Sequence, residues 1–369
     1  MTSASTAFPD ARRLSRAAAS PTPGKALLGN SFVHPFFDYM IIGGGLSLAL
    51  IGGMVAFGWN STEHLNRSLP MLYLLFNSAH FAASTVRLYT KRGSFEKLPF
   101  LTMGFPLVTV AVLVAALFFP GSLGYYINKV YLTWSPFHYA ATAYGLALIY
   151  SYRSGCEVRP ADKRLLRWSS LLPFFYALGL QELNGVEGWI LTPEVLASNT
   201  QMQWLLMRLV RLLALLSFIL PTYFLARPLL KRRRPWPLIV PLLLVSNGIW
   251  WIVFTGYTNA FNMATIFHGV QYLAIVAIFH VKERLREPGN QRGVLYHTIR
   301  FYLICLLLAV ALFQFWPYAF VLAGFGKTES ALLVIAVINI HHFIVDAYIW
   351  KLKSDPNYRN IAPAGAVAR

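Results

Sequence analysis

Apolar segments long enough to cross a lipid bilayer constrain this chain more than any other feature. A helix needs about 20 apolar residues to span the hydrocarbon core. Ten segments have roughly that length, at 36–59, 70–90, 100–119, 131–151, 168–190, 204–226, 237–256, 261–281, 301–321 and 330–350. Of the 369 residues, 56% are hydrophobic and 12% are charged. A soluble domain carries about 25% charged residues, so the composition excludes a soluble globular enzyme. We predict an all-α fold, a polytopic transmembrane helix bundle of about ten spans.

Lysine and arginine residues fall in alternate connections between these segments. The basic clusters lie in the N-terminal tail, in every second connection and after the last segment, and include Arg16, Lys25, Arg87, Lys91, Arg153, Lys163, Lys231, Arg232, Lys282, Arg284, Lys351 and Lys353. Positive charge marks the cytoplasmic side of membrane proteins, so both termini are expected in the cytoplasm. The same pattern explains the net charge of +18 without a nucleic-acid partner. We expect a multi-pass protein of a bacterial inner membrane.

The ends of the chain differ in composition from the apolar region between them. The first residues are polar and basic and include the run Pro21-Thr22-Pro23-Gly24. Such a composition is typical of disorder. We therefore expect a disordered basic cytoplasmic tail at 1–33, a transmembrane helical domain at 34–353, and a short cytoplasmic C-terminal tail at 354–369.

Five of the nine histidines lie inside predicted spans. They are His80, His138, His268, His341 and His342. Their spans, the second, fourth, eighth and tenth, all run from outside to inside. Each histidine lies about 7–12 residues from the outer end of its span, which at 1.5 Å per residue is a spread of about 7 Å in depth. These side chains are therefore expected to share one layer of the membrane.

Each of these histidines also belongs to a polar stripe on its helix. The stripes are Asn77, His80, Ser84 and Arg87; Ser135, His138 and Thr142; Thr265, His268, Gln271 and Tyr272; and Asn339, His342 and Asp346. Residues three, four and seven apart share a helix face. Polar groups within a bilayer normally face the interior of a bundle. The four stripes are therefore expected to converge.

Neutral imidazoles that converge in one layer are typical ligands of iron, copper or zinc. We predict a metal site formed by His80, His138, His268, His341 and His342. Asp346, Tyr272 and Arg87 are predicted to support catalysis there: Asp346 can ligate the ion or orient an imidazole, and Tyr272 can bond to a ligand. For Arg87, an inner anchor that snorkels to the interface is the alternative. The other alternative is that the histidines only bond across helices and stabilise the bundle.

Two short segments resemble the bacterial Brp/Blh-type carotene dioxygenases. They are Ser78-Ala79-His80-Phe81 and His341-His342-Phe343. Those membrane proteins bind one iron through single histidines on separate helices. The resemblance implies single-histidine iron ligation by His80, His138, His268 and either His341 or His342. It does not extend to the substrate.

These observations lead to one expected function and three alternatives. We expect an integral membrane oxidoreductase or oxygenase, dependent on non-haem iron, that acts on a lipid-soluble substrate. Its partners would be the bilayer, a hydrophobic small molecule, and an electron donor or a complex partner. Copper could replace iron. A haem b protein that transfers electrons, a transporter, and a structural subunit of a membrane complex remain the alternatives.

Overall fold

The structure is a computed structural model that describes residues 27–57, 62–91, 93–184, 188–231, 236–253 and 260–350. Most of the predicted N-terminal tail and all of the C-terminal tail lie outside these residues. Residues 27–33, which the sequence places in the tail, contact the rest of the molecule. For example, the carbonyl oxygen of Leu27 accepts a hydrogen bond from the backbone N–H of Leu238.

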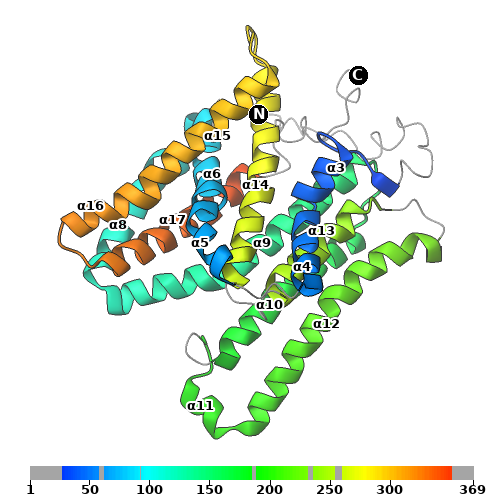
Figure 1. The fold of residues 1–369 in the computed structure, drawn as a ribbon, viewed down its shortest axis with the longest axis horizontal. Coiled ribbons are helices and arrows are strands. Elements are labelled where there is room, and N and C mark those ends of the chain that lie inside the picture. The colour runs from blue at the N-terminus through cyan, green and yellow to red at the C-terminus, as the bar shows by residue number, and fades with distance from the viewer. Residues whose placement is uncertain are drawn as a thin grey trace, which may run out of the picture.

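All regular structure in the described part of the chain is helical, as the sequence predicts. The elements are α3 (Pro35–Phe37), η1 (Asp38–Ile42), α4 (Gly45–Phe57), α5 (Thr62–Leu72), η2 (Tyr73–Ser78), α6 (Ala79–Thr90), α7 (Ser94–Lys97), η3 (Phe100–Gly104), α8 (Phe105–Phe118), η4 (Pro120–Gly124), α9 (Tyr125–Arg153), α10 (Pro160–Asn184), α11 (Pro193–Ser198), α12 (Thr200–Lys231), α13 (Ile239–Gly248), η5 (Ile249–Val253), α14 (Ala260–Leu285), α15 (Val294–Val310), η7 (Ala311–Phe315), α16 (Trp316–Leu322) and α17 (Lys327–Ile349). The elements labelled η are π-helical turns. Helices α10 and α12 form a hairpin that carries α11 near its tip (Figure 1).

Five helical segments are long and apolar enough to cross a membrane. They are Phe100–Phe118, Thr200–Ala226, Phe261–Leu285, Val294–Leu322 and Lys327–Ile349. A sixth span is possible at Pro35–Ile42 and Gly45–Met54, which meet at an angle of 63°. The apolar helix Ile239–Val253 is shorter. Helices also occupy the described parts of the other predicted ranges, where α6, α9 and α10 carry more polar residues. The prediction of about ten spans therefore stays a prediction.

A π-helical turn lies directly before the first predicted ligand. Pro70 lies inside α5 and has no N–H to donate, so it cannot make the usual helical hydrogen bond. The π-helix η2 then covers Tyr73–Ser78, and α6 begins at Ala79, one residue before His80. One extra residue in a turn rotates all later side chains by about 100°. The direction in which His80 points is therefore set partly by η2.

Glycine at position 269 lets α14 approach η2 closely. A Cβ atom there would lie 2.6 Å from the carbonyl oxygen of Phe76 and 3.2 Å from the Cα of Asn77. Both obstacles are backbone atoms, which cannot rotate away. This close approach brings His268, the neighbour of Gly269, next to the start of α6. The ring centroids of His80 and His268 are 5.1 Å apart.

Replacing Gly269 by alanine should therefore destabilise the protein by about 1–3 kcal/mol through overpacking, although alanine favours a helix by about 1 kcal/mol. Gly145→Ala in α9 is the matched control, because its added Cβ meets no atom within 4 Å. That control should be neutral or slightly stabilising. Denaturation midpoints of the two variants in detergent would measure the difference. Equal midpoints would contradict the close approach of α14 and η2.

Candidate metal centre

Four of the five predicted histidines lie together in the interior, each on a different helix. His80 is on α6, His138 on α9, His268 on α14 and His342 on α17. Their rings form a closed circuit. The centroid distances are 5.1 Å for His80–His268, 5.0 Å for His268–His138, 5.0 Å for His138–His342 and 4.8 Å for His342–His80. We call these four side chains, together with Asp346, the histidine cluster.

The histidine cluster is almost completely shielded from the surroundings. His80, His268 and His342 are 0% exposed. Neither ring nitrogen of His80 or of His268 makes a hydrogen bond of good geometry among the described residues. A buried polar atom without a partner costs about 1–3 kcal/mol. Four such atoms lie on the adjacent rings of His80 and His268, which could hold a ligand between them.

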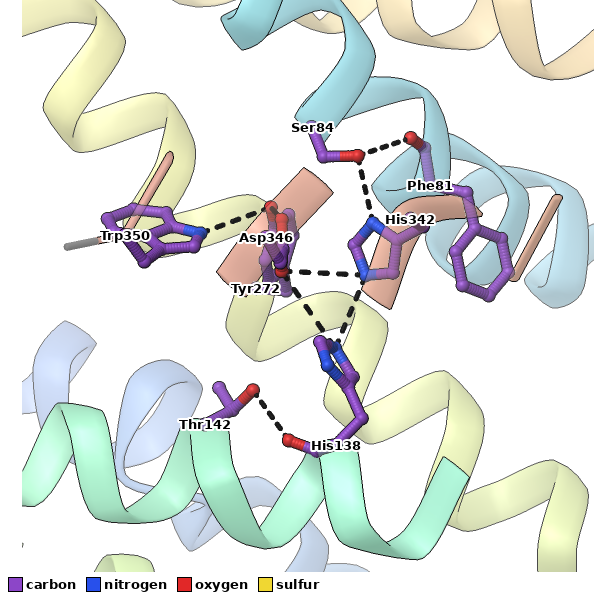
Figure 2. A network of polar contacts seen from close by, with 8 residues as sticks. All are labelled: Phe81, Ser84, His138, Thr142, Tyr272, His342, Asp346 and Trp350. Carbon is purple, nitrogen blue, oxygen red and sulfur yellow. Dashed lines mark hydrogen bonds and ion pairs between the residues drawn. The ribbon is translucent and has the colours of Figure 1, made fainter. Parts of the chain in front are cut away.

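One hydrogen bond fixes which nitrogen of His342 points to the middle of the cluster. The Ser84 hydroxyl donates to the carbonyl oxygen of Phe81 at 2.9 Å, and its oxygen lies 2.8 Å from Nδ1 of His342 (Figure 2). In the assignment in which the Ser84 proton goes to the Phe81 carbonyl, the His342 nitrogen donates to Ser84. Nδ1 therefore carries the proton, and Nε2 presents a lone pair to the cluster.

The spacing around Nε2 of His342 suits a metal ion. Nε2 of His138 lies 3.3 Å away, and Oδ2 of Asp346 lies 3.6 Å from His342 and 3.9 Å from His138. Two nitrogens bound to one tetrahedral ion at about 2.0–2.1 Å lie about 3.3–3.4 Å apart. Ligand atoms of His80, His268 and His342 lie within 4.8 Å of one another, and so do those of His138, His342 and Asp346. Both sets share His342.

Asp346 is held in place by two aromatic side chains. The Tyr272 hydroxyl donates to Oδ1 of Asp346 at 2.5 Å, and the Trp350 indole N–H donates to the Tyr272 oxygen at 3.3 Å. Figure 2 shows this chain running from Trp350 through Tyr272 to the carboxylate. The bond leaves Oδ2 of Asp346 directed to the two histidines. Tyr272 therefore orients a candidate ligand, as the sequence suggests.

Ring stacking fixes two further members of the cluster. The His268 ring stacks on Tyr139 with centroids 4.1 Å apart, and the His138 ring stacks on Phe343 at 4.5 Å. The Tyr139 hydroxyl is itself bonded to Thr265 at 3.1 Å. Sequence reasoning missed Tyr139 and Phe343. Each follows a histidine directly in the sequence, but stacking on the rings of other helices leaves no periodic signal.

His341 lies outside the histidine cluster. Its ring stacks on Phe105 of α8 at 4.6 Å, and its Nδ1 lies 2.7 Å from the Thr109 hydroxyl. Adjacent helical residues point about 100° apart, so only one of the two neighbouring histidines can face the cluster. The structure selects His342.

Arg87 also lies apart from the cluster, at the end of α6. Its Nη2 donates to Oε1 of Glu283 on α14 at 2.9 Å, and its guanidinium lies 5.0 Å from the ring of Trp350. The side chain is 1% exposed. It therefore does not snorkel into solvent. Instead it joins the ends of three helices that carry cluster members.

Most other residues of the predicted stripes bond within their own helix. The hydroxyls of Ser135 and Thr142 donate to the carbonyl oxygens of Tyr131 and His138, and the Asn339 amide donates to that of Ile335. Gln271 instead donates to the carbonyl oxygen of Ile42. Of the polar neighbours in the four stripes, Ser84 and Tyr272 have hydrogen bonds to the cluster.

Comparisons of the chain with protein-family models, with curated proteins and with solved structures found no match.

The Ser84 hydroxyl should matter for metal affinity. Ser84→Ala removes the group that fixes the tautomer of His342, and a lost orienting partner weakens metal binding about 10–100-fold. Thr142→Val is the matched control, because the Thr142 hydroxyl contacts a histidine carbonyl and no ring. Competition with a chelator would measure both affinities. Equal affinities for the two variants would argue against the assigned tautomer.

Proposed function

We propose that this protein is an integral membrane oxidoreductase that holds non-haem iron in the histidine cluster and acts on a lipid-soluble substrate. One observation carries the proposal. Four buried imidazoles from four helices form a circuit of adjacent rings, and two of them have no hydrogen bond of good geometry to either nitrogen among the described residues. Structural histidines are usually hydrogen-bonded when buried, so this arrangement favours ligation of an ion.

The chemistry of the donor set supports iron. Imidazole suits iron, copper and zinc, and a carboxylate shifts the preference toward harder ions. Four imidazoles and Asp346 provide up to five donors with a single negative charge. For a divalent ion, one positive charge remains for an anionic or polarisable ligand such as O2. When bound, the iron would supply the electrons and the binding position for that ligand.

The chain itself supplies orientation and a dry environment. Ser84 orients the imidazole of His342, and Tyr272 orients the carboxylate of Asp346. The side chains of His138 and Asp346 are 8% and 7% exposed, against 1% for His342. The side of the cluster with His138 and Asp346 is therefore the side that a substrate could reach. Because this region is surrounded by apolar helices, a lipid-soluble molecule fits it better than a polar one.

The membrane arrangement belongs to the same proposal. The basic residues at the ends of α6, α9 and α14 support a cytoplasmic location for those ends. With about ten spans, both termini would lie on that side, in a bacterial inner membrane. The helices of the cluster would then all run from outside to inside.

The haem and transporter alternatives have less support. A haem needs an open slot between its axial histidines, and here neighbouring rings are already in contact distance of each other. A transport path needs an open route, and three cluster histidines have no exposure at all.

Metal analysis of the purified protein tests the proposal directly. We expect about one iron per chain by mass spectrometry, and a visible spectrum without the intense band of haem. A haem spectrum would move the protein to the electron-transfer class. A protein free of metal and of haem after anaerobic purification would refute the proposal.

A further inference from the structure

A second charged site lies away from the histidine cluster, where the N-terminal residues cross the ends of α9 and α14. We call residues 27–38 the strap. The strap is tied down at several points. The Asn30 side chain donates to the carbonyl oxygen of Arg153 at 2.9 Å, and Nη2 of Arg153 donates to that of Ser31 at 2.9 Å. The strap therefore has a fixed position on these helix ends.

Two cations lie against one aromatic ring of the strap. The Arg153 guanidinium is 4.4 Å from the centroid of the Phe32 ring, and the Lys282 ammonium is 4.7 Å from the same centroid. The two charges are thus close enough to repel each other, and Arg286 adds a third positive charge to Lys282's surroundings. For Lys282, an attraction of about 0.5–1 kcal/mol to the ring does not replace an anion.

The nearby carboxylate is occupied by other donors. Asp38 is 0% exposed. Its Oδ2 accepts from the Phe32 N–H at 2.5 Å and from the Tyr150 hydroxyl at 2.8 Å, and its Oδ1 accepts from the Val33 N–H. It forms no ion pair with Lys282. Among the described residues, the partly buried Lys282 ammonium has neither a hydrogen bond nor an ion pair, although the charge of Asp38 acts on it.

We propose that Lys282 and Arg153, beside Phe32, bind a phosphate group. A phosphate carries a negative charge for the Lys282 ammonium, and its several acceptor oxygens also suit the guanidinium beside it. These helix ends carry the basic residues that mark the cytoplasmic interface, where phospholipid phosphates lie and basic pockets between helices bind headgroups. A free phosphate would offer the same chemistry. The site is independent of the metal proposed for the histidine cluster.

The test uses the full chain in phosphatidylcholine nanodiscs with and without phosphatidylglycerol. Native mass spectrometry counts the phosphatidylglycerol molecules that stay bound to the protein after it is released from the nanodisc. Lys282→Gln should reduce that occupancy about fivefold, since one basic residue contributes a factor of that order to anionic-lipid binding. Lys129→Gln is the control with the same loss of charge. Its ammonium also lies on an aromatic ring, at 4.6 Å from Trp189, but already donates to the carbonyl oxygen of Gly188 at 2.6 Å.

The second arm titrates inorganic phosphate against the protein in uncharged detergent. Displacement of the retained lipid by phosphate, with the same dependence on Lys282, assigns the site to free phosphate. Retention of the lipid assigns it to a headgroup. Equal losses in the Lys282 and Lys129 variants would overturn the proposal. So would a wild type that retains no phosphatidylglycerol and binds no phosphate.

Discussion

A variant in which His138 and His268 are both alanine should lose nearly all of its bound metal. The two rings are neighbours in the circuit and lie on separate helices, and their centroids are 5.0 Å apart. Removal of one group that merely orients a ligand weakens metal affinity about 10–100-fold. Removal of two ligands should therefore weaken it by at least that factor. Metal per chain, measured by mass spectrometry after purification, is the readout.

His341→Ala is the matched control for this double variant. It removes the same type of side chain from α17, next to His342, but its ring lies against Phe105 instead of the cluster. Its metal content should equal that of the wild type. Stoichiometric metal in the double variant would exclude the histidine cluster as the binding site. A loss of metal in the His341 variant alone would show that His341 is a ligand and that its placement outside the site is wrong.

Arg87→Met should cost about 2–4 kcal/mol of stability. Removing one partner of a buried ion pair leaves the other charge without compensation and costs about 3–5 kcal/mol. The value here is lower because the Glu283 side chain is 24% exposed, whereas that of Arg87 is 1% exposed. Unfolding of the protein in detergent, followed by its denaturation midpoint, would measure the loss.

Arg284→Met provides the comparison for Arg87. Arg284 also pairs with a glutamate, Glu287, at 2.8 Å, but both side chains are more than a quarter exposed, at 27% and 29%. An exposed pair contributes about 0–1 kcal/mol. Replacing Glu283 together with Arg87 should restore part of the stability, because the stranded charge is then gone. Equal effects of the two arginine variants would contradict the role of Arg87 as a buried clamp.

The sequence predicted the members of the histidine cluster better than their neighbours. Periodicity indicates which face of a helix is polar, and matched depth indicates which residues share a layer. Together they brought out His80, His138 and His268. They could not separate His341 from His342, because that choice depends on α8, whose Phe105 and Thr109 receive the His341 ring. Which helix lies beside which is not encoded in the period of either one.

Hydroxyl and amide residues in the stripes illustrate a second limit. Serine, threonine and asparagine in a helix can bond to a carbonyl one turn earlier, and Thr142 and Asn339 do so. Their presence in a stripe therefore did not show that they face a partner. Ser84 bonds within its helix and to His342 at once, a contact between residues 258 positions apart. Only the folded structure reveals it.

The distribution of the cluster over four helices has a consequence for how the protein matures. α6 and α9 are synthesised long before α14, and α17 is the last helix that the structure describes. His342, which belongs to both candidate ligand sets, arrives with that last helix. A nascent chain that has inserted all but α17 holds three imidazoles and no carboxylate of the cluster. Loading of the ion would then follow completion of the whole polypeptide, and metal content would report whether the final helix has reached its place.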